Sequence, residues 1–169
     1  LRKIFINFNK KLDKIQKALE AYLETKRNLF PRFYFLSNEE LLKSLAQAKD
    51  PRKVQGNLRK CFAGIVALKF EGNDIKAMYS AEGECVPLGN NLKARMNIEV
   101  WLASLENDMV KSLRKYMKKG VIDYEKIYHR GDWVLQQFAQ VVMTVSQIAW
   151  SRGCENAILD SNNSQAMKI

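Results

Sequence analysis

Of the residue types that often act in catalysis, this 169-residue chain has one histidine and three widely spaced cysteines. Its single histidine, His129, lies between Tyr128 and Arg130. A histidine acts as a general base when a nucleophile or an orienting carboxylate stands within hydrogen-bond reach. No serine, cysteine or carboxylate has a catalytic-motif spacing from His129, so we interpret it as a loop residue.

The three cysteines, Cys61, Cys85 and Cys154, are odd in number and widely spaced. This pattern favours reduced structural thiols in a cytosolic protein over a disulfide framework. With one histidine and no cysteine pair at ligand spacing, a zinc site is not expected. We therefore predict no metal and no cofactor in this segment.

Other features that resemble active-site motifs have simpler explanations. The pair Glu39-Glu40 follows Ser37 at a predicted helix start, where capping and the helix dipole favour carboxylates. No GxxxxGK[ST] phosphate-binding loop occurs. The glycines of EGND (71–74) and EGE (82–84) lie between predicted strands, where turns require them. We expect no catalytic residue here.

The formal charge of +10 could favour binding to nucleic acid, an anionic membrane or an acidic protein. The basic residues are spread along the polar sides of several predicted helices, so a solvated face is the favoured explanation. From Lys26 to Phe35, cations alternate with aromatic residues, as in single-strand binders. Aromatic residues beside a proline more often form a core corner, and we predict no nucleic-acid partner. The apolar runs are too short for a membrane span, so we predict no membrane partner.

Hydrophobic periodicity predicts a long helix over residues 1–29. Apolar residues recur in steps of three and four on one side, which indicates a face that needs a partner along its length. These seam residues are Phe5, Phe8, Leu12, Ile15, Leu19 and Tyr22. The helical pattern is already present at Leu1, so we expect the sequence to be part of a longer polypeptide.

A rigid corner is predicted after this helix. Pro31 ends the helix because it removes a backbone donor and restricts the preceding residue. We expect Phe30, Phe33 and Phe35 to fill the junction, while Lys26, Arg27 and Arg32 stay solvated or contact acidic groups. A capping box at Ser37 and Glu40 starts a second helix, and Asp50-Pro51 starts a third that carries Val54, Leu58, Phe62 and Ile65.

The remaining chain is predicted to hold a small sheet and further helices. Residues 67–96 alternate and contain turn signals, typical of an antiparallel hairpin or three strands, with Pro87 in an edge strand or at its end. Asn97 caps a long helix that we expect to end at Lys118-Lys119-Gly120. A short helical turn at 124–128 and a final helix from about Asp132 complete the pattern.

The predicted fold class is mainly α: an elongated array of helical bundles with a small antiparallel β insertion. We expect three parts within a larger structure. These are a helical subdomain at 1–66, the β insertion at 67–96 and a second helical subdomain at 97–169.

Four separated blocks resemble the linker region of dynein heavy chains. They are ALEAYLETKRNLFPRFYFLSNEELLKSLAQAKDPRKVQGNLRKCFAGI, MYSAEGECVPL, NIEVWLASLENDMVKSL and WVLQQFAQVVMTVSQIAW, in the family's order. The similarity is closer to axonemal than to cytoplasmic heavy chains around KDPRKVQGNLRKCF and AMYSAEGE, although IAWS suits the cytoplasmic type too. The family commonly has Trp-Pro-Gly where this chain has Gln137, Phe138 and Ala139, so we expect a more regular helix there.

The resemblance implies a mechanical lever that arches over a ring of AAA+ ATPase modules and moves as the ring hydrolyses ATP. It implies that ATP and magnesium belong to the parent ring, and that the partners are this ring and other dynein subunits. Microtubules would be reached only through the parent motor, in the cytoskeleton of a cilium or flagellum.

Two places could accommodate movement, the corner at 28–32 and the connection at 118–123. The exposed turn of Glu71, Gly72 and Asn73, together with Arg27 and Arg32, is the candidate contact with the ring or a partner. A helical adaptor for acidic protein surfaces and a basic nucleic-acid module remain the alternative functions.

Overall fold

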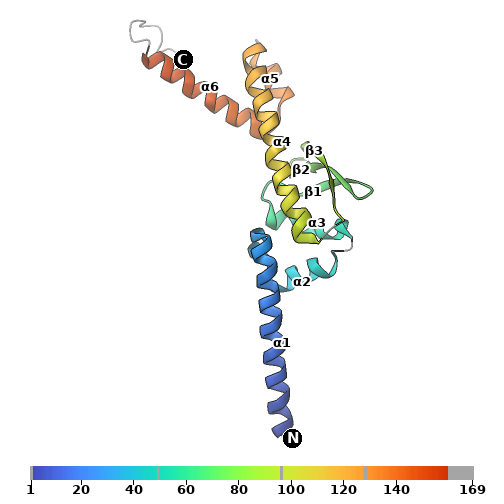
Figure 1. The fold of residues 1–169 in the computed structure, drawn as a ribbon. Helices are drawn as coiled ribbons and strands as arrows, with labels where there is room; N and C mark the ends of the chain where they lie inside the picture. Colours follow the sequence, from blue (N-terminus) through green and yellow to red (C-terminus); the bar gives the residue numbers. More distant parts are fainter. Residues whose placement is uncertain (1, 49, 96, 128, 160–169) are drawn as a thin grey trace. The chain divides into compact units, whose positions relative to one another are not determined.

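The computed structural model describes residues 2–48, 50–95, 97–127 and 129–159. The chain is mainly α-helical with one three-stranded antiparallel sheet, which confirms the predicted fold class (Figure 1). It divides into two compact units, Leu1–Asp108 and Met109–Ile169. The division into subdomains at 1–66, 67–96 and 97–169 stays a prediction.

The first helix, α1, runs from Arg2 to Leu29, as its periodicity predicts. Residues 2–22 are all exposed, and Leu23 is the buried residue of the helix. Figure 1 shows α1 extending beyond α2, its neighbour in the first unit. The face that was predicted to need a partner is therefore uncovered among the described residues.

A 3-10 helix, η1 (Pro31–Phe35), turns the chain after α1. Next come α2 (Asn38–Ala46) and α3 (Pro51–Cys61). The capping box of Ser37 and Glu40 is present, and the Asp50 side chain caps α3 with Pro51 in its first turn. The predicted apolar side is buried, with exposures of 3% or less: Val54, Leu58, Phe62 and Ile65.

The sheet has the strand order β1-β2-β3, with β1 (Ala67–Glu71), β2 (Asp74–Tyr79) and β3 (Cys85–Lys93). Glu71 pairs with Asp74 across a two-residue turn in which Gly72 has a φ of +63°. A positive φ at the first central position suits glycine, which has no Cβ to clash. Pro87 lies in β3 and pairs with Ala77, so the predicted edge position is confirmed.

The long helix α4 (Ile98–Lys126) begins directly after Asn97. Its first turns place Ile98, Trp101, Leu102 and Leu105 in the core of the first unit, each no more than 1% exposed. The strand β3 is joined to α4 by Asn90, whose backbone N–H donates to Oδ2 of the buried Asp108 at 3.4 Å.

The predicted end of this helix at Lys118-Lys119-Gly120 is wrong. The helix continues to Lys126, and Gly120 lies inside it. A Cβ at Gly120 would lie 2.4 Å from Cγ1 of Val141. The glycine is therefore required by close helix packing rather than by a left-handed helix end. The segment 118–123 is continuous helix. The short turn expected at 124–128 begins inside α4, which ends at Lys126, and residue 128 lies outside the described residues.

The second unit also contains α5 (Arg130–Gln136) and α6 (Ala139–Leu159). Its core forms around Trp133, Val141 and Val145. The Trp133 ring meets Tyr124 edge-on at 5.0 Å, and its indole N–H donates to the Gly120 carbonyl at 3.1 Å. No described helix is long and apolar enough to cross a membrane.

The expectation of one regular helix through Gln137, Phe138 and Ala139 is wrong. Gln137 is extended, with φ −111° and ψ 157°, and separates α5 from α6. Its side-chain amide donates to Asp123 at 3.2 Å, while Phe138 meets the Tyr116 ring edge-on at 4.7 Å. Tertiary contacts with α4 therefore hold a helix break here without a proline.

Candidate functional site

The corner between α1 and α2 is built on a repeat of three residues. A 3-10 helix has three residues per turn, so Phe30, Phe33 and Leu36 fall on one side of η1. Their side chains are 1%, 1% and 3% exposed. The rings of Phe30 and Phe33 meet edge-on at 4.9 Å, and Phe62 from the end of α3 lies 6.1 Å from Phe30. Pro31 begins η1 and is exposed, whereas the predicted corner residues Phe30 and Phe33 form a buried junction.

The inclusion of Phe35 in this junction is wrong. Its side chain is 68% exposed, because the three-residue turn directs positions 34 and 35 away from the side occupied by Phe33. Tyr34 is exposed too, and its hydroxyl donates to the carboxylate of Glu24 in α1.

Two ion pairs join the corner to α4. Lys26 donates to Oε1 of Glu99 at 2.6 Å, with side-chain exposures of 17% and 3%. Arg32 donates to Oε1 of Glu106 through Nε at 3.0 Å and Nη2 at 2.9 Å. The two glutamates are seven residues apart, which places them two turns apart on one face of α4. The end of α1 and η1 are thereby fixed to the same helix face.

Arg32 also reaches α3. Its Nη1 donates to the carbonyl of Cys61 at 3.0 Å, and the guanidinium lies 4.9 Å from the centre of the Phe62 ring. A guanidinium combines planar hydrogen bonding with stacking in a way that an ammonium does not. Arg32 therefore connects η1, α3 and α4 at once, and its polar atoms are engaged within the first unit.

Because the Lys26–Glu99 pair is largely buried, losing one partner affects stability more than it would in a surface ion pair. The hydrogen bond to Glu99 raises the pKa of Lys26 above its ordinary value, although desolvation works in the opposite direction. The second carboxylate oxygen of Glu99, Oε2, is buried without a hydrogen-bond partner among the described residues. Glu99 consequently depends on Lys26 for the compensation of its charge.

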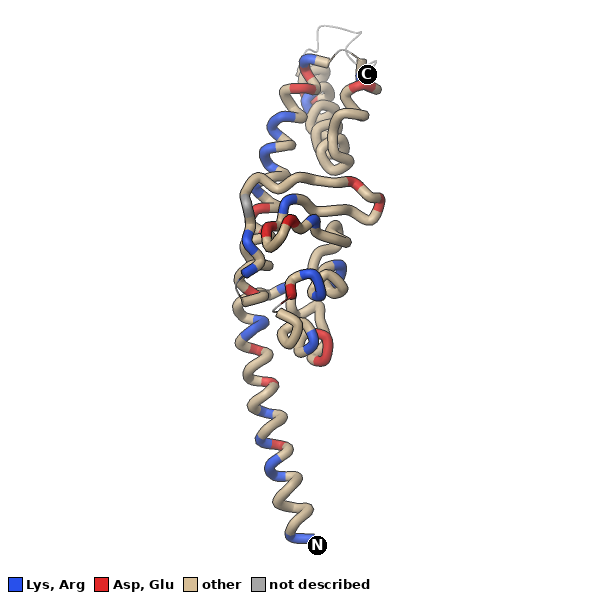
Figure 2. Tube along the Cα trace, turned by 90° about the vertical axis from the view of Figure 1, so that its right-hand side faces the viewer, with Lys and Arg blue, Asp and Glu red and all other residues tan. Residues whose placement is uncertain are grey.

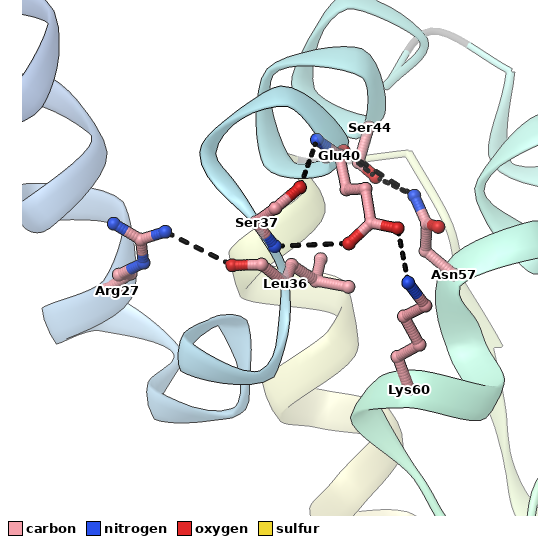
Figure 3. A network of polar contacts seen from close by, with 7 residues as sticks. All are labelled: Arg27, Leu36, Ser37, Glu40, Ser44, Asn57 and Lys60. Carbon is pink, nitrogen blue, oxygen red and sulfur yellow. Dashed lines mark hydrogen bonds and ion pairs between the residues drawn. The ribbon is translucent and has the colours of Figure 1, made fainter.

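A second polar network ties α2 to its neighbours (Figure 3). The backbone N–H of Ser37 donates to Glu40 at 3.1 Å, and Glu40 also accepts from Lys60 of α3. The hydrogen bond from Lys60 is the largest cause that lowers the pKa of Glu40. The side-chain amide of Asn57 donates to Ser44 Oγ at 2.7 Å, so α3 holds α2 at two places.

Arg27, one of the predicted partner contacts, faces this network from α1. Its Nη2 donates to the carbonyl of Leu36 at 3.2 Å (Figure 3). The same nitrogen donates to Oδ1 of Asn38 at 2.9 Å. Its guanidinium also lies 5.7 Å from the Tyr34 ring centre. These contacts close the corner from the α1 side. Both predicted arginines thus bind groups of this chain, and a contact with a partner stays a prediction.

The other predicted contact, the β1–β2 turn, is separate from the corner network. Glu71, Gly72 and Asn73 are exposed at the tip of the hairpin. The turn borders an open hollow of about 320 Å³ at the start of α3, lined by Asp50, Pro51, Arg52, Phe70, Gly72 and Asn73. Its lining offers an arginine, an amide and a carboxylate that already caps α3. The structure brings none of the reactive residues considered above to this place.

The residues with possible reactive roles belong to different elements. His129 is exposed at the N-cap of α5. Cys61 is buried, which raises the pKa of its thiol to about 11, while Cys85 is exposed and Cys154 half-buried. Within the described residues, no three His, Cys, Asp or Glu side chains could hold a metal ion together.

Sequence reasoning missed Glu99 and Glu106 as members of the site. Their seven-residue spacing on a predicted helix was visible, but nothing local identified Lys26 and Arg32 as partners 73 and 74 positions away. The role of Gly120 beside Trp133 was missed for the same reason. A search for two carboxylates two helix turns apart, as possible partners of the basic residues at the corner, would have suggested the Lys26–Glu99 and Arg32–Glu106 pairs.

Comparison with known proteins places this architecture in a family. The model for "Dynein heavy chain, N-terminal region 2" matches residues 1–120. The chain is 48% identical to human dynein axonemal heavy chain 6 across 99% of its length and 46% identical to rat dynein axonemal heavy chain 12 across 92%. It is 39% identical to the Chlamydomonas reinhardtii dynein-1-beta heavy chain of the flagellar inner arm I1 complex across 95%.

The chain therefore belongs to the dynein heavy chain family, as the resemblance predicted. It spans about 5% of the length of the human and rat relatives and 4% of the Chlamydomonas one. The matched region is the N-terminal part of a heavy chain.

Proposed function

We propose that this segment is a mechanical linker, or lever, of a dynein heavy chain and carries out no chemistry itself. Its role is to transmit the ATP-driven conformational change of an AAA+ ring to movement along microtubules. The observation that carries the proposal is the corner, where Lys26 and Arg32 fix the end of α1 and η1 to one face of α4.

A lever needs joints that do not yield under load. Phe30 and Phe33 fill the corner with rings that are 1% exposed, and packed interiors have low compressibility. Arg32 adds directional contacts to Glu106 and the Cys61 carbonyl. A force applied along α1 therefore reaches α4 through buried packing and charged hydrogen bonds rather than through a free loop.

Family membership supports the proposed partners and place of action. The AAA+ ring of the same heavy chain is the direct partner, ATP and magnesium bind in that ring, and other dynein subunits complete the motor. The relatives named axonemal or flagellar support a location in the cytoskeleton of cilia or flagella. The exposed turn of Glu71, Gly72 and Asn73 is the proposed contact with the ring.

The test is to loosen the corner in a full-length heavy chain that contains this segment. The double variant Lys26→Met, Arg32→Ala removes both ion pairs. We expect slower microtubule gliding while microtubule-stimulated ATP hydrolysis persists. The matched control is Lys53→Met, whose side chain is 64% exposed and lies 4.0 Å from Asp50. Equal gliding velocities in the double variant and the control would reject the lever function.

The ring contact has its own test. Replacing Asn73 and Glu71 with alanine removes the side chains of the turn but leaves the positive φ of Gly72 in place. An altered gliding velocity with an unchanged melting temperature of the segment is expected. An unchanged velocity would remove the turn from the proposed contact without affecting the argument for the corner.

A further inference from the structure

The exposed side of α1 is a continuous apolar surface. Six residues, three or four positions apart, are each between 38% and 64% exposed: Phe5, Phe8, Leu12, Ile15, Leu19 and Tyr22. We call this set the α1 seam. Contiguous exposed apolar surfaces in soluble proteins mark sites of interaction. The seam extends over about 26 Å of helix, at 1.5 Å per residue.

The spacing of the seam residues indicates that a helix would fit them. The steps alternate between three and four residues, which is the seven-residue repeat of a two-stranded coiled coil. Such a repeat places each apolar residue between side chains of a facing helix. Since the described residues 2–22 are exposed all around α1, the seam is open to such a helix.

Charge on and beside the seam selects the chemistry of that helix. Residues 2–17 contain six basic side chains and one acidic side chain, Asp13, a net charge of +5. Figure 2 shows the basic residues distributed along α1. The positions that flank the seam in this part hold Arg2 and Lys11 but no carboxylate: Arg2, Ile4, Asn9, Lys11, Gln16 and Ala18.

A second copy of the chain does not fit this surface well. It would bring a second segment of charge +5 against the first, and Asp13 does not lie at a flanking position where it could pair with Lys11. Like charges across a helix pair are unfavourable, whereas glutamates opposite the flanking positions of a coiled coil form interhelical ion pairs with lysine and arginine.

We propose that the α1 seam binds an acidic amphipathic helix in a two-stranded coiled-coil arrangement. The apolar face of that helix covers the seam, and its flanking carboxylates face Arg2 and Lys11. This binding surface is distinct from the corner, because residues 2–22 take no part in the buried junction. It goes beyond the proposed lever function and does not depend on it.

The probes for the test are two synthetic helices with leucine at the seam positions. One carries glutamate and the other lysine at the flanking positions. Isothermal titration with the 169-residue chain is expected to give about tenfold tighter binding for the acidic helix, because it forms two exposed ion pairs where the lysine helix meets two like charges. Added salt should reduce this difference. The variant Lys11→Glu should shrink or reverse it.

The seam variant is Leu12→Ala, Ile15→Ala, whose original side chains are 62% and 64% exposed, so the fold is not at risk. We expect this variant to bind the acidic helix more than about tenfold more weakly, because less apolar surface is buried. The control Lys10→Ala, Lys17→Ala changes the opposite side of α1 and should alter affinity by less than about threefold.

Three results would overturn the proposal. The lysine helix could bind as tightly as the glutamate helix, or the seam variant could bind as the unaltered chain does. Light scattering could instead reveal a dimer of the chain that the seam variant dissolves, in which case a second copy occupies the seam. Circular dichroism of each variant verifies that the helices are retained.

Discussion

The side chain of Lys26, near the end of α1, donates a 2.6 Å hydrogen bond to Glu99 in the first turn of α4, and the Glu99 side chain is only 3% exposed. The pair crosses 73 positions of sequence. A buried carboxylate with one charged partner is sensitive to the loss of that partner, because its own charge then remains uncompensated. The corner therefore depends on a lysine near the end of a helix whose residues 2–22 are exposed.

Lys26→Met should destabilise the chain by about 2 kcal/mol, since it leaves Glu99 buried and unpaired. Urea unfolding followed by circular dichroism measures this loss. The double variant Lys26→Met, Glu99→Gln should recover part of it, because the uncompensated charge is gone. A single variant as stable as the unaltered chain would show that Glu99 is compensated in another way.

Two rings of η1 provide a matched comparison. Phe33→Ala should cost about 3–5 kcal/mol, because it removes a ring from a packed junction. Phe35→Ala should change the free energy of unfolding by less than about 0.5 kcal/mol, because Phe35 is on the surface. Thermal melts of both variants test the arrangement, and equal melting temperatures would contradict the three-residue repeat of η1.

Cys61 should make the chain less stable at alkaline pH. Burial raises the pKa of its thiol from 9.0 to about 11, so the unfolded chain loses this proton before the folded chain does. The stabilisation is complete below pH 9 and declines as the pH rises toward 11. By pH 10.5 the loss should be about 2 kcal/mol. Urea unfolding at pH 8.5–10.5 should therefore give a shallower decline for Cys61→Ala than for the unaltered chain, and an equal decline would contradict the burial of the thiol.

Gly120 and Gly56 test the close approach of α4 and α6. Gly120→Ala would place a Cβ 2.4 Å from Val141 Cγ1, and overpacking of this kind costs about 1–3 kcal/mol. Gly56→Ala, inside α3 with no atom within 4 Å of the new Cβ, should stabilise by about 0.5–1 kcal/mol. Differential scanning calorimetry should show opposite shifts in melting temperature. Shifts in the same direction would contradict the packing described for Gly120.

Elements set by local chemistry could be predicted from the sequence. The periodicity of α1, the capping box of Ser37 and Glu40, and the Asp50-Pro51 start of α3 each depend on residues within one or two turns. The Gly72 turn belongs to the same group, because a two-residue hairpin needs a positive φ at one known position. In these segments local preference and final structure agree.

Features set by distant contacts could not be predicted in this way. Gly120 carries a helix-end signal, yet its lack of a side chain serves the approach of Val141. Gln137 breaks a helix because its neighbours pack on α4, not because of its own preference. Within the site, Arg32 was identified as a corner residue, but its pairing with Glu106 depends on a fold that brings two distant segments together.

The most direct test of the lever function is the distance moved per ATP, obtained as gliding velocity divided by the rate of ATP hydrolysis in a full-length heavy chain that contains this segment. The Arg32–Glu106 pair suits a charge exchange because its side chains are 34% and 35% exposed. Arg32→Glu should lower this ratio, and adding Glu106→Arg should restore part of it. If the ratio is unchanged in Arg32→Glu while hydrolysis itself falls, the corner serves catalysis or stability rather than force transmission, and the account is wrong.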